Sequence, residues 1–371
     1  MNASRAEELG QLLFIGLEED CWSSALEKRL RTIRPAGIIL NQANLTSPDS
    51  AAALTAKIAH TLDTPPFLAL VGEVGTVNPL PSFFPPLPSP LAVAAMGPRA
   101  ARELGKLSGA GLKLMGFNMT FAPSLDISSN PANATVRQVS FGVDGEKVAA
   151  LGEAFVQGLQ SSDVLACPKS FPGFGDARPD ADSGLLTSAK PMARMWREDL
   201  VPYRNILPRV QLVMVSYLAY KAYDLNSAIP ASISSNVLEG LLRVKLGYRG
   251  ICLADYYSAA TEMLSFLNPS TPGSISMDFE TLPKSIAAGV DILVVMGGAR
   301  FSELVGETLK KSQKAGTLTT QRISEAIKRI ARAKKGLRRP TGKFSKKTFD
   351  RICREFEDFS QGCRSAERGI D

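Results

Sequence analysis

Histidine is almost missing from this sequence: among 371 residues there is one, His60. A single histidine excludes mechanisms that need two imidazoles and most zinc sites built on histidine ligands. The five cysteines are scattered and form no Cys-x-x-Cys motif, which argues against a structural zinc site and a disulfide framework. No cofactor is implied and no metal site is predicted, because the acidic stretch at 176–182 lacks the spacing of an EF-hand loop.

Targeting and membrane signals are absent as well. No stretch reaches the ~18 consecutive apolar residues that a transmembrane helix needs. The first residues, from Met1 to Glu8, lack the apolar run of a secretory signal peptide. Scattered thiols suit a reducing compartment. We therefore expect a cytoplasmic protein with no membrane span.

Positive charge is concentrated near the C-terminus. Between Lys328 and Arg354 twelve residues are basic and one, Asp350, is acidic, in a chain whose formal net charge is +7. One interpretation is a solvated helix and tail, and the other is contact with an anionic partner such as nucleic acid or a membrane surface. No RNA-binding or helix-turn-helix signature accompanies the cluster. We expect residues 338–371 to form a basic, mobile C-terminal extension.

Short apolar runs recur along the chain and alternate with helical patterns. Most runs are continuous, as expected for strands that are covered on both faces. The predicted strands are 12–17, 37–40, 67–71, 118–122, 164–168, 212–216, 250–254 and 291–296. Helices are predicted at 98–115, 144–161, 236–246 and 319–335.

Eight strands with intervening helices predict an α/β fold, a single-domain (β/α)8 TIM-type barrel over residues 1–337. A doubly wound open sheet is the competing fold. Neither Gly-x-Gly-x-x-Gly nor Gly-x-x-x-x-Gly-Lys-[Ser/Thr] occurs, so no nucleotide-binding fingerprint supports the open sheet.

Polar side chains follow several predicted strands, at the end of a barrel where catalytic residues are found. They are Glu73, Asp126, Lys169, Ser170, Asp176, Asp180, Asp182, Tyr217 and Asp255. Several carboxylates around one pocket favour glycoside hydrolysis, which needs a nucleophile and a separate proton donor. Carboxylates also cap helices and bind loop backbone. This structural interpretation is favoured for Asp126, because Asn130 and Asn133 follow it in a turn-rich segment.

A set of motifs between about Glu8 and Gly336 has an order and spacing typical of one family. The motifs are Glu8-Leu-Gly-Gln-Leu-Leu-Phe-Ile-Gly-Leu, Gly37-Ile-Ile-Leu, Leu87-Pro-Ser-Pro-Leu-Ala, Gly116-Phe-Asn-Met-Thr-Phe-Ala-Pro-Ser-Leu-Asp, Ser140-Phe-Gly, Lys169-Ser-Phe-Pro-Gly-Phe-Gly, Glu198-Asp-Leu-Val-Pro-Tyr, Pro230-Ala-Ser-Ile-Ser, Leu246-Gly-Tyr-Arg-Gly-Ile and Ala288-Gly-Val-Asp. The chain resembles the family 3 glycoside hydrolases, in their single-domain β-N-acetylglucosaminidase branch. The resemblance implies a barrel that hydrolyses β-linked N-acetylglucosamine, in a β-glycoside or a peptidoglycan-derived amino sugar.

The resemblance also implies functional residues, and several are changed here. Where the family has Lys-His-Phe-Pro-Gly-His-Gly, this chain replaces the two histidines by Ser170 and Phe174. The family's Asp-Ser-His, which carries the Asp–His general acid/base dyad, reads Asp182-Ser183-Gly184. The histidine that the family usually has after the sixth strand is replaced by Tyr217. Asp182 therefore lacks the histidine partner that the resemblance implies.

The implied sugar-binding positions change too. Where the family has a substrate-binding aspartate, this chain has Gly72, with Glu73 beside it. Where the family has a substrate-binding arginine, it has Val139, with Arg137 two positions earlier. Two central residues are kept: the nucleophile aligns with Asp255 and the sugar-binding lysine with Lys169. The predicted catalytic residues are Asp255 and Asp182, and the predicted substrate-binding residues are Lys169, Glu73, Arg137, Ser170, Phe174, Tyr217 and Tyr256.

Three hypotheses follow. The chain is an impaired or inactive family 3 homologue that keeps the barrel and binds a glycan fragment or a protein. Alternatively, it is an active retaining glycosidase with Asp255 as nucleophile and Asp182, Asp176, Asp180 or Glu73 as proton donor. The third hypothesis is a non-catalytic scaffold or regulatory protein that acts through the basic C-terminal segment. A structural ion pair between Asp255 and Lys169 is also left open.

Overall fold

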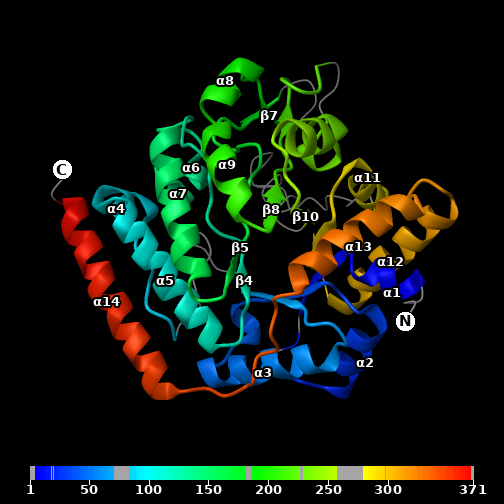
Figure 1. Ribbon diagram of the computed structural model, residues 1–371, viewed down its shortest axis with the longest axis horizontal. Coiled ribbons are helices and arrows are strands. Elements are labelled where there is room, and N and C mark those ends of the chain that lie inside the picture. Colours follow the sequence, from blue (N-terminus) through cyan, green and yellow to red (C-terminus); the bar gives the residue numbers. More distant parts are fainter. Residues whose placement is uncertain are drawn as a thin grey trace, which may run out of the picture.

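A ring of eight parallel strands forms the centre of the fold (Figure 1). The computed structural model describes residues 5–17, 19, 21–70, 83–180, 185–225, 229–256, 279–296 and 298–368. The strands are β1 (Leu13–Gly16), β2 (Gly37–Leu40), β3 (Phe67–Leu70), β4 (Met119–Thr120), β5 (Leu165–Ala166), β8 (Leu212–Val215), β10 (Ile251–Asp255) and β11 (Ile292–Val295). They pair in parallel in the order β5-β4-β3-β2-β1-β11-β10-β8, which leaves β5 and β8 as the two ends of the sheet. The eight predicted strands and the barrel are confirmed.

The ring closes between β5 and β8 through the chain that follows β5. Phe171 forms a parallel bridge with Val215, and its N–H donates to the Met214 carbonyl at 3.0 Å. Lys169 forms a second parallel bridge with Ser124, which follows β4. The loop after β5 therefore acts as an extension of that strand and brings Lys169 to the carboxyl-terminal end of the barrel.

Helices cover the outside of the barrel (Figure 1). They are α1 (Arg5–Gly10), α2 (Ser24–Ile33), α3 (Pro48–Thr61), α4 (Pro90–Met96), α5 (Pro98–Leu114), α6 (Ala134–Val139), α7 (Gly145–Gln160), α8 (Met192–Arg197), α9 (Leu200–Ile206), α11 (Thr281–Ala288), α12 (Gly298–Lys314), α13 (Thr320–Lys334) and α14 (Lys346–Arg368). Short 3₁₀ turns lie at η1 (Gln42–Asn44), η2 (Leu207–Arg209) and η3 (Ala231–Ile233), and η4 (Asn236–Lys245) is a π-helix. The four predicted helices correspond to α5, α7, η4 and α13.

Local sequence explains where these helices begin. The side chains of Ser47, Asp144 and Thr319 each accept a hydrogen bond from a backbone N–H in the first turn of α3, α7 and α13. Such caps satisfy donors that the helix itself leaves unpaired. Gly105 and Gly158 allow the backbones of α5 and α7 to approach closely, since a side chain at either position would overlap the backbone of the facing helix.

The core consists of the continuous apolar runs seen in the sequence. All four residues of β1, β2, β3, β8 and β11 are buried. Side chains on one face of each strand fill the barrel, and those on the other face pack under the helices. A small second sheet is formed within the segments that follow β5 and β8, by β6 (Arg178–Pro179), β7 (Leu186–Ser188) and β9 (Ala219–Tyr220).

The C-terminal segment contains a docked helix where the sequence suggested a mobile tail. Helix α14 lies along α4 and α5 (Figure 1), and its residues Phe349, Ile352 and Phe356 are buried. The Phe356 ring packs edge-on against Phe84 at a centroid distance of 5.1 Å. The apolar face accounts for the docking, since burying such side chains removes them from water. The domain boundary at residue 338 stays a prediction. In the described part of the chain, no helix combines the length and apolar character needed to cross a membrane.

Candidate active site

The loop 169–175 is the centre of the candidate site. It leaves β5 between β4 and β8, and the Lys169 N–H donates to the Pro123 carbonyl at 3.2 Å. Ser170 adopts a φ of 73°, a left-handed conformation that is unfavourable for a residue with a side chain. Lys169 and Ser170 are both half-buried. The loop thus presents partly exposed polar side chains at the carboxyl-terminal end of the barrel.

Asp126 anchors this loop from the segment that follows β4. Its Oδ1 accepts a hydrogen bond from the Phe174 N–H at 2.7 Å, and its Oδ2 accepts one from the Ser124 hydroxyl at 2.8 Å. Burial raises the pKa of Asp126 to about 6, although hydrogen bonds from Phe174, Ser170 and Ser124 and the charge of Lys169 act in the opposite direction. Asp126 therefore has the structural role that its turn-rich surroundings predict.

Two buried tyrosines hold the same loop from behind. The Tyr203 hydroxyl, on α9, donates to the Lys169 carbonyl at 2.7 Å, and the Tyr220 hydroxyl, on β9, donates to the Gly173 carbonyl at 2.6 Å. Burial raises the pKa of both tyrosines well above the usual value, so both remain protonated donors. The backbone on either side of Phe171 is thereby fixed.

A buried ion pair supports Gly173. The Lys190 ammonium lies 2.9 and 2.8 Å from the two carboxylate oxygens of Asp199, and both side chains are buried. Burial raises the pKa of Asp199, while the Lys190 charge opposes that shift. Gly173 has a φ of 132°, and a Cβ there would lie 2.9 Å from the Asp199 Cβ. Only glycine fits this position without strain.

Asp255 is the last residue of β10 and is half-buried at the same end of the barrel. Its neighbour Ala254 pairs with Val215 of β8, so β8 separates the Asp255 strand from the Lys169 loop. A carboxylate and an ammonium group therefore emerge on either side of one strand. An ion pair between them stays a prediction.

An aromatic pair occupies two positions where the family resemblance implies histidines. The rings of Phe174 and Tyr217 meet edge-to-face with centroids 5.2 Å apart. Phe174 is buried, and Tyr217, which follows β8, is half-buried. Such a contact is apolar and offers no imidazole for hydrogen bonding or proton transfer. It makes the wall beside Lys169 less polar than the resemblance implies.

The remaining predicted site residues are not all brought to the loop. Glu73 and Asp182 lie outside the described residues. Arg137 is exposed on α6, whereas Val139, two positions later, is buried. The Tyr256 hydroxyl is buried near Ser232 and Ser285, and burial raises its pKa to about 12. A contact of Arg137 or Tyr256 with substrate stays a prediction.

The acidic residues after the loop already have cationic neighbours. Asp176 lies 3.4 Å from Arg178, and Asp180 lies 2.7 Å from Lys221. Among the described residues, no cluster of three or more His, Cys, Asp or Glu side chains has the arrangement of a metal site.

Sequence reasoning missed the residues that position the loop. Tyr203 lies on α9 and Tyr220 on β9, whereas Lys190 and Asp199 lie just before α8 and α9. A signal existed for two of them, because Asp199 and Tyr203 belong to the family motif that begins at Glu198.

Comparison with known proteins places this geometry in context. Residues 5–333 match the model of the glycosyl hydrolase family 3 N-terminal domain. The β-hexosaminidase of Alkalilimnicola ehrlichii is 32% identical over 252 residues, which cover 66% of this chain and 71% of that protein. Beta-hexosaminidase A of Pseudoalteromonas piscicida is 27% identical over 249 residues, 63% of this chain but only 40% of that longer protein. A family 3 β-N-acetylglucosaminidase structure from Paenibacillus sp. superposes with a TM-score of 0.81 at 27% identity, covering 97% of this chain and 69% of that one.

Proposed function

Because the chain belongs to glycosyl hydrolase family 3, we propose that it acts on β-linked N-acetylglucosamine with Asp255 as nucleophile and with weakened proton donation. A retaining glycosidase forms a covalent glycosyl-enzyme, so it needs a carboxylate at the anomeric carbon and an acid at the glycosidic oxygen. The relatives named β-hexosaminidase and β-N-acetylglucosaminidase support this substrate class.

The position of Asp255 supports the first half of the proposal. A side chain at the carboxyl-terminal end of a barrel strand faces the mouth where substrates bind. Lys169 lies across β8 from Asp255, and in this proposal its ammonium group donates a hydrogen bond to a sugar hydroxyl. Its loop is held by Asp126, Tyr203 and Tyr220, so little reordering is needed when a sugar binds.

The location of His60 supports the second half of the proposal, the weakened proton donation. It is the one histidine of the chain and lies in the last turn of α3, just before β3 begins, so it is at the opposite end of the barrel. It is exposed, and its Nδ1 lies 2.8 Å from the Ala56 carbonyl oxygen. An Asp–His dyad at the mouth therefore cannot come from this chain. A lone aspartic acid has an ordinary pKa of ~3.9 and is ionised at neutral pH, which makes it a poor proton donor.

A series of aryl β-N-acetylglucosaminides tests the proposal. With weak proton donation, we expect kcat/KM to fall by at least ~10²-fold from the 2,4-dinitrophenyl to the unsubstituted phenyl glycoside, because the better leaving group needs no proton. A β-hexosaminidase with an intact dyad serves as the control and should show a shallower dependence. Similar rates for all leaving groups would mean that another acid has replaced the dyad.

Glycan binding without turnover is a second candidate function. The Phe174–Tyr217 contact favours it, because apolar rings stand where the resemblance implies polar ones. Saturable binding of N,N′-diacetylchitobiose, with no hydrolysis of any aryl substrate, would select this candidate over the first.

A further inference from the structure

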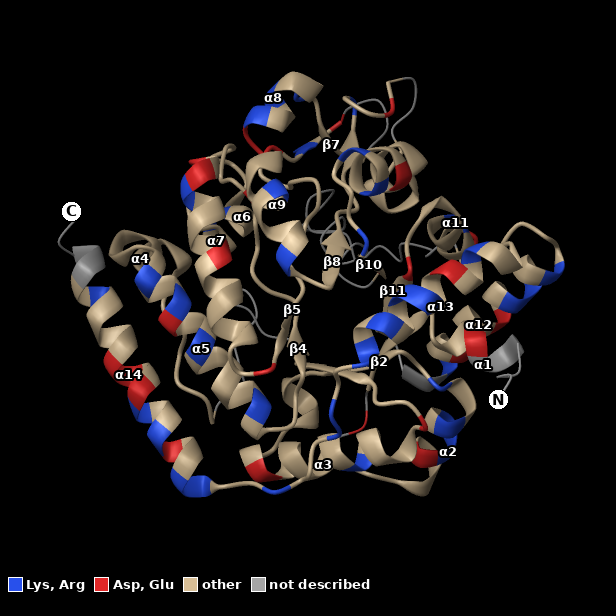
Figure 2. Cartoon of the chain, viewed as in Figure 1, with Lys and Arg blue, Asp and Glu red and all other residues tan. Residues whose placement is uncertain are grey.

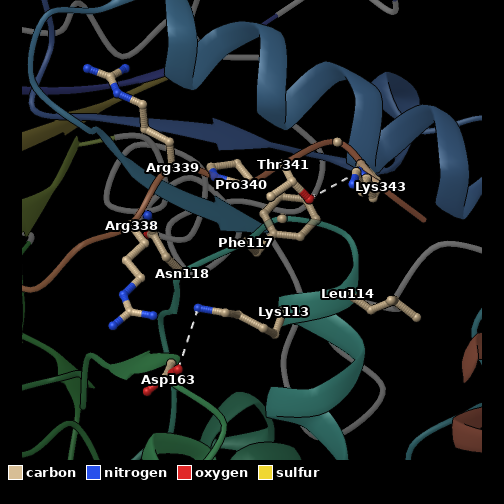
Figure 3. Close-up of a pocket in the computed structure, with 13 residues that line it drawn as sticks. Lys113, Leu114, Phe117, Asn118, Asp163, Arg338, Arg339, Pro340, Thr341 and Lys343 are labelled. Carbon is tan, nitrogen blue, oxygen red and sulfur yellow. Dashed lines mark hydrogen bonds and ion pairs between the residues drawn. The ribbon is translucent and has the colours of Figure 1, made fainter. Parts of the chain in front are cut away.

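A cavity of about 250 Å³ lies at the amino-terminal end of the barrel, opposite the candidate active site (Figure 3). One wall is the end of α5 with the turn that leads into β4, and the other is the segment 338–343 that joins α13 to α14. Its charged lining residues are Lys113, Asp163, Arg338, Arg339 and Lys343.

The charge in this cavity is strongly positive, with four cationic side chains against one carboxylate. The Lys113 ammonium lies 3.9 Å from Asp163, whose side chain is 84% exposed, so solvent screens this pair. In Figure 3, Arg338 and Lys113 extend toward the same side of the cavity, next to Asp163. Arg338 and Lys343 are exposed, and neither forms an ion pair with another described residue.

Arg339 adds an unsatisfied buried donor, and the partial negative charge at the C-terminal end of α5 is partly neutralised by hydrogen bonds. One Arg339 nitrogen donates to the Asp63 carbonyl at 2.6 Å, whereas the other, Nη1, is buried with no partner among the described residues. The carbonyls at the end of α5, which would otherwise attract cations, already accept hydrogen bonds. The Met115 carbonyl accepts from the Thr55 hydroxyl at 2.9 Å, and the Lys113 carbonyl accepts from the Gly116 N–H at 3.0 Å.

The wall that carries Arg338 and Lys343 is held in place from both sides. Gly342 packs over Ala56 of α3, and the Phe344 ring meets Phe349 of α14 at 5.7 Å. Lys and Arg are also frequent at the start of α14, which follows this wall (Figure 2). A site built on docked elements pays little ordering cost when a ligand binds.

We propose that this cavity binds a small phosphate-bearing anion, with Arg338, Lys343 and Lys113 as its main contacts. Guanidinium groups match phosphate oxygens in geometry, and ammonium groups add charge. The volume suits a diphosphate or triphosphate group better than a polymer, which would extend beyond the cavity. Two of the three contacts come from residues after 333, where the family 3 match ends, so the site is independent of the proposed glycosidase function.

Calorimetric titration of the full chain with inorganic pyrophosphate and tripolyphosphate tests the proposal, at an ionic strength fixed near ~0.15 M with NaCl. We expect saturable binding of one anion per chain and a rise in the melting temperature, because a ligand that binds only the folded state stabilises it. The double variant Arg338→Gln, Lys343→Gln should weaken binding at least ~10-fold, since it removes two charge-assisted contacts. Lys113→Gln changes the opposite wall and should weaken binding several-fold.

The matched control removes two charges from exposed α14 positions outside the cavity, as Lys347→Gln, Arg354→Gln. Its affinity should stay within about twofold of the unaltered chain. Circular dichroism shows whether each variant is folded. The proposal is overturned if the unaltered chain binds neither anion saturably. Equal loss in both double variants would also overturn it, and would indicate a diffuse positive surface of the kind that binds nucleic acid or membranes.

Discussion

Asp255→Asn is expected to lower the hydrolysis of a 2,4-dinitrophenyl β-N-acetylglucosaminide by at least ~10³-fold. The amide has nearly the same shape as the carboxylate, but it cannot attack the anomeric carbon as an anion. The 2,4-dinitrophenyl leaving group departs without a proton, so attack by the nucleophile on this substrate does not depend on a proton donor. Asp255 is half-buried at a strand end, and we expect the melting temperature of the variant to change little.

Asp358→Asn is the matched control for this experiment. Asp358 is exposed on α14, outside the barrel mouth, and the same change in charge there should leave kcat/KM unaltered. Retention of full activity in Asp255→Asn would remove Asp255 from the mechanism and would require another nucleophile.

Asp291→Leu is expected to destabilise the protein by about 3–5 kcal/mol, the largest effect on stability that we predict. Asp291 is fully buried at the start of β11, and three arginines bind it. Its Oδ1 lies 2.7 Å from Arg322 and 2.8 Å from Arg329, and its Oδ2 lies 2.8 Å from Arg243. Leucine would remove the only buried counter-charge of Arg243 and Arg322 among the described residues, and these side chains are only 5% and 10% exposed. Arg322 would keep only the half-exposed Glu325, 3.8 Å away. Urea unfolding at neutral pH measures the loss.

Two further variants separate charge from packing at this position. Adding Arg243→Met and Arg322→Met to Asp291→Leu should recover much of the loss, because an apolar cluster needs no counter-charge. Asp350→Asn breaks the surface pair with Lys346, whose side chains are 41% and 81% exposed, and should cost under about 1 kcal/mol. A loss of less than about 1 kcal/mol for Asp291→Leu would mean that the arginine cluster contributes little.

The barrel could be predicted because its signal is local. Each buried strand is a short apolar run, and helices with identifiable caps lie between the runs. The closure of the ring had no such local signal in the sequence. It depends on Phe171, in a stretch with two prolines and polar neighbours that does not resemble a strand, and on its bridge to Val215 more than forty residues away.

The docking of α14 had a signal that the basic composition concealed. Phe349, Ile352 and Phe356 recur at spacings of three and four residues, as on one face of an amphipathic helix. The prediction of a mobile tail rested on the basic composition and did not consider this apolar spacing. Lys346, Lys347, Arg351 and Arg354 of α14 are exposed, so this helix is both basic and docked.

The candidate site, too, could be predicted only in part from the sequence. The positions of Lys169 and Asp255 at strand ends could be predicted from the strands and the family motifs. The support from Tyr220 and from the Lys190–Asp199 pair could not, because these residues meet the loop only in the folded chain. Asp291 was visible only as a carboxylate beside an apolar run, and its three arginine partners lie on η4 and α13.

Azide capture is the most direct test of a barrel that keeps its nucleophile but has weak acid–base assistance. Water must lose a proton to attack the glycosyl-enzyme, whereas azide attacks as an anion and needs no base. With the 2,4-dinitrophenyl substrate, we expect azide to raise turnover at least ~10-fold and to yield a β-configured glycosyl azide. Unchanged turnover with the hydrolysed sugar as sole product would contradict it.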